Sequence, residues 1–232
     1  MSNSFDEHAS KYDAWFMENT NVLLSEARLV AQTLSGSHKI LSVGCGSGLF
    51  EKILREDFGI NITDGIEPAL GMAEIARKRG VTVDVTTAEE GDFGNGKYDT
   101  ILFNGSPSYI ADLQPIVDKA YANLPAGGRL ILIDVPKESG YGLLYNLAKA
   151  TGSWDHPLLK GVAPANPYPI ELVNAANWRT SAEKTEAMLS AGFKKIESWQ
   201  TLTSHPLTSN YKAESPTDGT DKGEYVAILG YK

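Results

Sequence analysis

The sequence predicts an α/β protein with a doubly wound sheet of seven strands, mostly parallel, and an antiparallel strand near its C-terminal end. Short apolar runs alternate with stretches of helical periodicity between residues 38 and 135, as in repeated strand–helix units. The run 129–135 is strongly apolar, which is typical of a strand buried on both faces. The last two expected strands follow each other without a helix between them, so they should pair antiparallel.

The N-terminal part shows helical periodicity from Phe5 to Leu34, and Asn19-Thr20-Asn21 is expected to divide it into two helices. The elements expected after it are a strand at 39–43, a helix at 49–58, a strand at 61–66, a helix at 69–79, strands at 81–85 and 98–103, a helix at 113–124, a strand at 129–135, a helix at 181–191, and strands at 194–202 and 223–231. This order, with right-handed crossovers, is typical of a Rossmann-like sheet. Residues 204–222 are expected to form a polar connection.

The segment 136–179 breaks this rhythm. It is rich in glycine, proline and aromatic residues, and it follows the carboxyl end of an expected central strand. Ligands bind at that end of α/β sheets, so we expect an irregular insertion that covers a substrate.

The composition argues against several functions. Of the 232 residues, 29 are acidic and 21 are basic, which gives a net charge of −8 and disfavours a nucleic-acid partner. The basic run Arg77-Lys78-Arg79 is expected to be the solvated end of a helix. The single cysteine excludes an intrachain disulfide, and residues 1–10 do not resemble a signal peptide. No apolar stretch reaches the ~20 residues that a membrane span needs, so we expect a cytoplasmic protein without membrane insertion.

Three glycines follow the first expected strand and precede a helix. Gly44, Gly46 and Gly48 let the backbone turn tightly and pass close to a ligand. A tight turn between a strand and a helix, without a ligand, would explain these glycines as well.

Glu67 ends the second expected strand, about 20 residues after the first glycine. A carboxylate there can accept hydrogen bonds from both hydroxyls of a ribose, whereas the alternative is an exposed loop glutamate. The glycines and Glu67 together predict an adenosine-containing ligand. A dinucleotide site would have a third glycine where this chain has Leu49, which disfavours a nicotinamide-dependent oxidoreductase.

Several spaced motifs, in order, resemble those of the class I S-adenosylmethionine-dependent methyltransferases. They are Ile40 to Leu49, Gly65-Ile66-Glu67-Pro68 with Met72, Ala76 and Arg77, Lys97 to Asn104, and Leu124 to Leu130. The opening Tyr12-Asp13-Ala14-Trp15-Phe16 is similar to the start of the UbiE-like group, which methylates small molecules. The resemblance extends from about residue 12 to the final strand.

The resemblance implies S-adenosylmethionine as cofactor. The three glycines would line its methionine and ribose portions, and Glu67 would hold the ribose hydroxyls. The resemblance also implies that Ser42 and Cys45 of the glycine motif contact the cofactor, and that Ile66 and Pro68 flank its adenosine. Ala88 and Glu89 would contact the adenine ring, and Asn104 would contact the methionine amine. Tyr12 and Trp15 would belong to an N-terminal cover over the cofactor.

Two positions depart from the family pattern. Ser42 stands where the family usually has Asp or Glu, and Thr87 stands where many members carry an aspartate. A hydroxyl brings no charge to the cofactor, and charge-assisted hydrogen bonds are roughly twice as strong as neutral ones. Weaker or rearranged cofactor binding is therefore expected.

We expect one methyltransferase domain over residues 1–232. Its parts would be a helical cover at 1–37, a cofactor-binding core at 38–135, a substrate cover at 136–180, and a C-terminal helix and strand pair at 181–232. The expected reaction is in-line methyl transfer to a small molecule, with S-adenosylhomocysteine as product. A protein that binds these compounds without catalysis is the alternative.

Candidates for a general base are His156 and Tyr109. His156 lies in the aromatic insertion, although it also fits a surface loop. Tyr109 follows the fourth strand and fits a packing role equally well. The four histidines show no metal-ligand spacing, so no metal site is expected.

Overall fold

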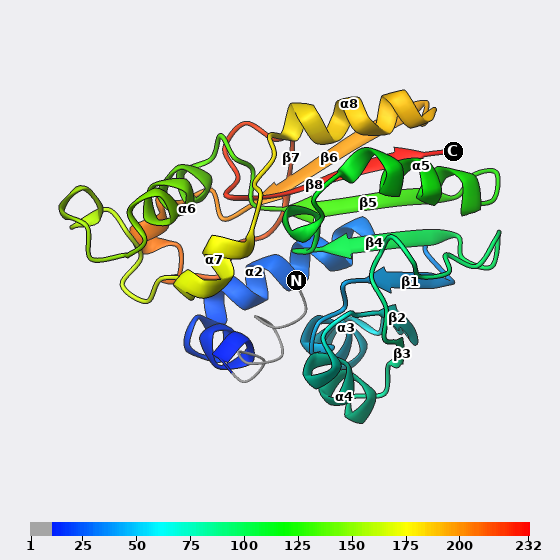
Figure 1. The fold of residues 1–232 in the computed structure, drawn as a ribbon, viewed down its shortest axis with the longest axis horizontal. Helices are drawn as coiled ribbons and strands as arrows, with labels where there is room; N and C mark the ends of the chain where they lie inside the picture. Colours follow the sequence, from blue (N-terminus) through cyan, green and yellow to red (C-terminus); the bar gives the residue numbers. More distant parts are fainter. Residues whose placement is uncertain (1–10) are drawn as a thin grey trace.

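One eight-stranded sheet runs through the computed structural model, which describes residues 11–232 (Figure 1). Its strand order is β3-β2-β1-β4-β5-β8-β6-β7. The strands are β1 (Ile40–Val43), β2 (Asp64–Ile66), β3 (Thr82–Asp84), β4 (Thr100–Asn104), β5 (Arg129–Asp134), β6 (Lys195–Thr201), β7 (Thr217–Asp218) and β8 (Tyr225–Tyr231). The first five strands pair in parallel, and β8 is antiparallel to both β5 and β6. The predicted Rossmann-like fold is therefore confirmed.

The predicted number of strands is wrong by one. The additional strand, β7, lies within the segment 204–222 that was expected to be a polar connection, and it pairs with Trp199 and Gln200 of β6. Gln200 also donates from Nε2 to the carbonyl oxygen of Asp218 at 3.0 Å. Two exposed residues are too few to show a period, so the sequence pattern could not reveal this strand.

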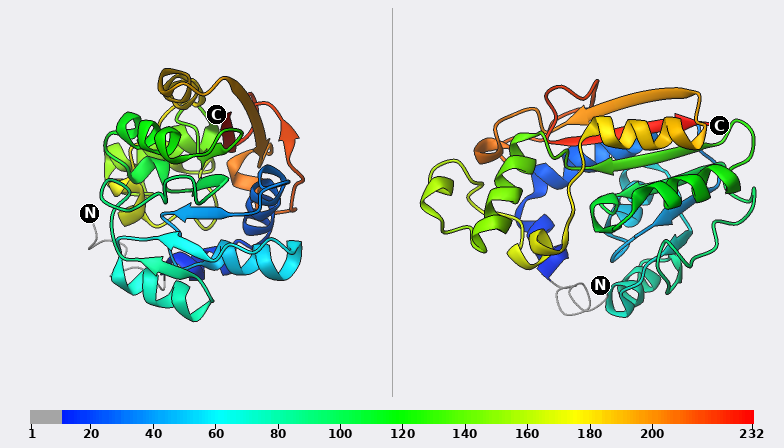
Figure 2. Two further views of the ribbon diagram at one scale, coloured as in Figure 1. Left: turned by 90° about the vertical axis from the view of Figure 1, so that its right-hand side faces the viewer. Right: turned by 45° about the horizontal axis from the view of Figure 1, so that its top comes forward.

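Helices cover both faces of the sheet (Figure 2). They are α2 (Thr20–Thr33), α3 (Leu49–Phe58), α4 (Leu70–Lys78), α5 (Leu113–Asn123), α6 (Gly140–Thr151), α7 (Ile170–Ala175) and α8 (Ser181–Ala191), with short 3-10 helices η1 (Pro107–Tyr109), η2 (Pro157–Leu159) and η3 (Pro206–Thr208). Alternate residues of β5 face opposite sides. Ile131 and Ile133 pack in the same core as α2 and α3, whereas Leu130 and Leu132 pack with α5 and α8. The apolar run of β5 reflects burial on both faces.

The segment 136–179 is more regular than expected, because it contains α6 and α7. Ser139 caps α6 by accepting a hydrogen bond from the backbone N–H of Gly142, and Gly152 ends this helix with φ +71°. Three of the four glycines of this segment lie at the two ends of α6, where glycine is tolerated. Figure 1 shows α6 and α7 beyond the carboxyl ends of β4 and β5.

The N-terminal helical stretch divides as predicted. Residues 11–18 are helical, Asn19 interrupts the helix, and α2 begins at Thr20. Phe5 and the rest of residues 1–10 lie outside the described part of the chain. Across residues 11–232, each helix falls short of the length and apolar character that crossing a lipid bilayer would require.

Candidate functional site

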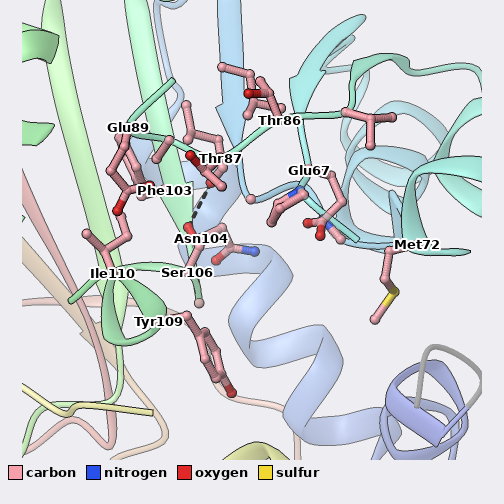
Figure 3. A pocket seen from close by; sticks show the side chains of 18 of the residues that line it. Glu67, Met72, Thr86, Thr87, Glu89, Phe103, Asn104, Ser106, Tyr109 and Ile110 are labelled. Carbon is pink, nitrogen blue, oxygen red and sulfur yellow. Dashed lines mark hydrogen bonds between the residues drawn. The ribbon is translucent and has the colours of Figure 1, made fainter. Parts of the chain in front are cut away.

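A cavity of about 490 Å³ lies at the carboxyl ends of the parallel strands, in the size range of small-molecule sites. Val43 of β1, Ile66 of β2 and Asn104 of β4 contribute to its wall. In Figure 3, Glu67 and Met72 lie toward one side of this cleft, and Phe103 and Ile110 lie toward the other. The parallel order of these strands brings residues distant in sequence to one place.

The glycine loop after β1 forms the floor of the cleft. Gly44 and Gly46 both have positive φ, but they lie in different surroundings. Gly44 has φ +71°, and a Cβ there would lie 2.5 Å from Cβ of Ser106, so the loop packs directly against the segment that follows β4. Gly46 has φ +56°, and no heavy atom lies within 4 Å of the place where its Cβ would be. The backbone at Gly46 is therefore open to a ligand in the cleft.

Glu67 joins this loop to the end of β2. Its Oε2 accepts from the backbone N–H of Gly46 at 2.9 Å, and its Oε1 accepts from the N–H of Ala69 at 2.9 Å. The residue is 6% exposed and lines the cleft. The carboxylate is thus fixed by two backbone donors at a position beside the open glycine.

The far end of the cleft is a turn at residues 86–91, after β3. Lys119 of α5 holds this turn by donating from Nζ to the carbonyl oxygens of Ala88 at 2.9 Å, Glu89 at 3.0 Å and Gly91. The hydroxyl of Thr87 accepts from the N–H of Glu90 at 3.3 Å. This end of the cleft is lined by Thr86, Thr87, Ala88, Glu89 and Glu90, none of which is an aspartate.

Asn104 ends β4 between the two ends of the cleft, and its side chain is held in place. Tyr225 of β8 donates from its hydroxyl to Oδ1 of Asn104 at 2.9 Å. Nearby, Ser106 donates to the carbonyl oxygen of Val43 at 2.7 Å, which closes the gap between β4 and the glycine loop. Two neighbouring strand ends are thereby fixed to each other.

Tyr12 covers the cleft from the helical residues 11–18. The next residue, Asp13, accepts from the hydroxyl of Ser47 and forms an ion pair with Arg79 at 2.6 Å, while Arg79 also donates to the carbonyl oxygen of Ser47. The expectation of a solvated Arg79 is therefore wrong, because this side chain links α4, the glycine loop and the N-terminal helix.

A carboxyl group lies beside β1 although residue 42 is a serine, because Glu51 of α3 supplies it. The hydroxyl of Ser42 donates to Oε1 of Glu51 at 2.7 Å, and both residues are buried. Burial raises the pKa of Glu51, and the hydrogen bond from Ser42 opposes that rise. Neither side chain lines the cleft, so any influence of Ser42 on a ligand passes through the packing of the loop.

A smaller cavity of about 60 Å³ adjoins the cleft and shares Tyr12, Gly105 and Tyr109 with it. Its other walls come from the helical residues 11–18, α2, the end of β5, α6, the two flanks of α7 and the start of β8: Trp15, Phe16, Glu26, Asp134, Val135, Tyr145, Tyr168, Trp178 and Tyr225. The two cavities together offer a long cleft with a side chamber.

The two candidate bases lie in different surroundings. Tyr109 faces both cavities, and its pKa is raised well above the usual value, first by burial and then by Tyr168. Its hydroxyl therefore keeps its proton at neutral pH. His156 lines neither cavity; its Nδ1 accepts from the N–H of Leu158 and caps η2.

The cleft brings together most of the cofactor residues expected from sequence. Those that line it are Tyr12, Gly44, Gly46, Ile66, Glu67, Pro68, Ala88, Glu89 and Asn104. Ser42, Cys45 and Gly48 lie behind the lining, and Trp15 lines the smaller cavity. Gly48 permits close packing, because a Cβ there would lie 3.1 Å from Ala76 of α4.

Sequence reasoning missed Lys119, Glu26 and Asp134. Asp134 ends β5 as Asn104 ends β4, so the rule that strand ends carry function could have identified it. Lys119 acts on a turn distant in sequence, which no local pattern indicates. Glu26 lies on the apolar face of a helix, where it is easily taken for an exception to the period.

The residues present fit an adenosine-containing cofactor. The open backbone at Gly46, the carboxylate of Glu67 and the apolar walls near the turn 86–91 lie along one cleft. Among residues 11–232, no three His, Cys, Asp or Glu side chains are grouped as a metal site requires.

Known proteins resemble this chain over most of its length. A family model described as "Methyltransferase domain" matches residues 16–198. An uncharacterized protein of Methanocaldococcus jannaschii is 26% identical over 230 residues, which are 99% of this chain and 99% of that protein. The trans-aconitate 2-methyltransferase of Rhizobium leguminosarum bv. trifolii is 24% identical over 215 residues, covering 87% of this chain and 76% of that enzyme.

A solved structure is also similar. The SAM-dependent methyltransferase of Thermotoga maritima, described as a "possible histamine N-methyltransferase", matches with a TM-score of 0.84 and 29% sequence identity. The match covers 100% of this chain and 99% of that one.

The different surroundings of the loop glycines predict different costs of substitution. Gly46→Ala should lose about 1–2 kcal/mol of unfolding free energy, the cost of a left-handed non-glycine residue. Gly36→Ala is the matched control, because Gly36 also has positive φ and an open Cβ direction but lies outside the cleft. Gly44→Ala should lose about 1–3 kcal/mol more, because its Cβ would overlap Ser106. Urea unfolding of the three variants measures this, and equal losses at Gly44 and Gly36 would contradict it.

Proposed function

The chain belongs to the class I S-adenosylmethionine-dependent methyltransferases, and from this premise we propose that it methylates a small molecule bound in the chamber beside the cofactor cleft. The cofactor is S-adenosylmethionine. When bound, it supplies an activated methyl group on a positively charged sulfur. The protein's own residues have to bind the two partners, align them and exclude water.

Four groups of this chain have the chemistry to hold the cofactor. The carboxylate of Glu67 would accept from the ribose hydroxyls, and the open backbone at Gly46 would lie against the same part of the ligand. Ile66 and the turn at 86–91 would pack against the adenine ring. Asn104, fixed by Tyr225, would face the amino-acid portion.

The acceptor would enter from the side chamber. An electron pair of the acceptor would form the new bond to the methyl carbon that the bound cofactor supplies, and the electrons of the broken carbon–sulfur bond would remain on the sulfur. Tyr12 and Tyr109 face both cavities, so they would lie at the junction where the two partners meet. The raised pKa of Tyr109 suits a protonated hydroxyl that donates a hydrogen bond rather than a base.

One observation carries the proposal: Glu67 and the open backbone of Gly46 line a single cleft and are joined by a hydrogen bond of 2.9 Å. The names of relatives support a small acceptor, because trans-aconitate 2-methyltransferase is among them. At Ser42, one of the two positions from which we expected weaker cofactor binding, the hydroxyl donates to the carboxyl group of Glu51 in α3.

Glu67→Ala should weaken the binding of S-adenosylhomocysteine by about 1.5–3 kcal/mol, or roughly ten- to 150-fold, because hydrogen bonds to a charged group are lost. Isothermal titration calorimetry measures the change. Asp64→Ala is the control, since Asp64 lies at the other end of β2 and outside the cleft lining. An unchanged dissociation constant in Glu67→Ala would refute the assignment of this carboxylate to the ribose.

Gly46→Ala should reduce affinity for S-adenosylhomocysteine at least about tenfold, because a methyl group would stand where the ligand approaches the backbone. Gly36→Ala, with the same backbone strain, should bind normally. Transfer of labelled methyl from S-adenosylmethionine into a small-metabolite extract then tests catalysis itself. Tight binding without any transfer would favour the non-catalytic alternative.

A further inference from the structure

The side chamber contains an unusual combination of groups. Its walls are mostly aromatic, from residues 11–18, η1, α6, the flanks of α7 and the start of β8, and the only acidic side chains among the described residues that line it are those of Glu26 and Asp134. Among the described residues that line the chamber or the main cleft, none is Lys, Arg or His. The chamber therefore holds two carboxyl groups and no cationic side chain on its surface.

Glu26 is the more unusual of the two acids. It is 7% exposed, in the middle of α2, and faces the chamber. Within residues 11–232 its carboxyl group makes no hydrogen bond, and the groups that act on its pKa are its burial and Asp134, both of which raise it. Burying a carboxyl group without a partner costs free energy, so a ligand is the natural source of the missing partner.

Asp134 differs because the protein supplies it with partners. Its Oδ1 accepts from the N–H of Val135 at 2.8 Å, and the buried Lys184 of α8 acts to lower its pKa against the effect of burial. Lys184 balances one of the two carboxyl groups at most. With both acids ionised, the chamber retains an unbalanced negative charge.

The aromatic rings favour the same kind of ligand. Trp15 and Tyr168 pack edge to face at 5.1 Å, and Tyr145 lies 5.2 Å from Trp178 and 6.1 Å from Tyr168. Such rings attract a cation over their faces, most strongly where water is excluded. A carboxylate-bearing acceptor would be repelled by either acid in its ionised form, whereas a cation would stabilise that form.

We propose that the methyl acceptor carries a protonated amine, which binds in the chamber against the carboxyl group of Glu26 with aromatic rings around it. This inference rests on the methyl transfer proposed above and specifies the acceptor class. Asp134 contributes to the attraction from the end of β5. The amine thereby places the acceptor at the junction of the two cavities, next to Tyr12 and Tyr109.

Calorimetry with S-adenosylhomocysteine already bound tests the acceptor class. The probes are histamine, tyramine and 2-phenylethylamine, each paired with the alcohol in which a hydroxyl replaces the amine. At least one amine should bind about tenfold or more tightly than its alcohol, as expected for a desolvated charged contact. If none binds better than its alcohol, or if carboxylic acids bind better, the proposal is overturned.

Glu26→Gln should abolish that preference for the amine while leaving S-adenosylhomocysteine binding unchanged. Glu224→Gln is the matched control, because Glu224 is also buried, at 8% exposed, but lines neither cavity and bonds to the N–H of Tyr141. The Glu224→Gln variant should still bind the amine more tightly than the alcohol. If Glu26→Gln instead weakened only the charged methyl donor, Glu26 would serve the sulfonium and the proposal would fail. If the unmutated protein did not bind S-adenosylhomocysteine at all, the result would refute the proposed methyl transfer rather than the proposed acceptor class.

A stability measurement separates a ligand-binding role of Glu26 from a structural one. Because its folded-state pKa is raised, the unmutated protein should lose stability relative to Glu26→Gln as pH rises above about 4.5. Urea unfolding at several pH values measures the difference. A relative gain with rising pH would show that Glu26 has a favourable partner in the fold and would overturn the proposal. The other ionisable groups around the chamber are Asp134, with Lys184 behind it, and the phenols of Tyr12, Tyr109, Tyr145, Tyr168 and Tyr225, whose raised pKa values keep them protonated.

Discussion

The carboxyl group of Glu67 connects the two backbone bends on which the cleft depends. One oxygen accepts from the loop after β1 and the other from the turn after β2, so a single side chain sets the spacing between two parallel strand ends. Neighbouring parallel strands leave their last residues at the same level, and Val43 pairs with Ile66 in this sheet. Both bends contribute residues to the lining of the cleft.

Much of the fold and of the cofactor cleft could be predicted, because their signals are local. Gly44 and Gly46 follow an apolar run, and Glu67 ends the next one, so strand order alone brings them together. The helices α3 and α8 begin and end at the predicted residues for a similar reason, since glycines and a capping threonine, Thr180, mark their limits.

The rest depends on contacts between distant residues. The pairing of Asp13 with Arg79 and the reach of Lys119 to the turn at 86–91 leave no local trace in the sequence. Glu26 is a different case. Its position on a helix is visible in the sequence, but whether a buried acid is neutralised, paired or left for a ligand depends on side chains from several other elements.

The position of β8 has a consequence for the order in which the molecule can form. This strand is made after the seven others, yet it lies between β5 and β6 rather than at the margin of the sheet. While the chain is being synthesised, β5 therefore presents an open edge. The side chain of Asn104 is fixed only after Tyr225 has been added and can donate its hydrogen bond. A truncation that removed residues 225–231 would remove a strand from inside the sheet and separate β5 from β6. The strands that carry the cofactor cleft would then end in an unpaired edge that is prone to aggregation.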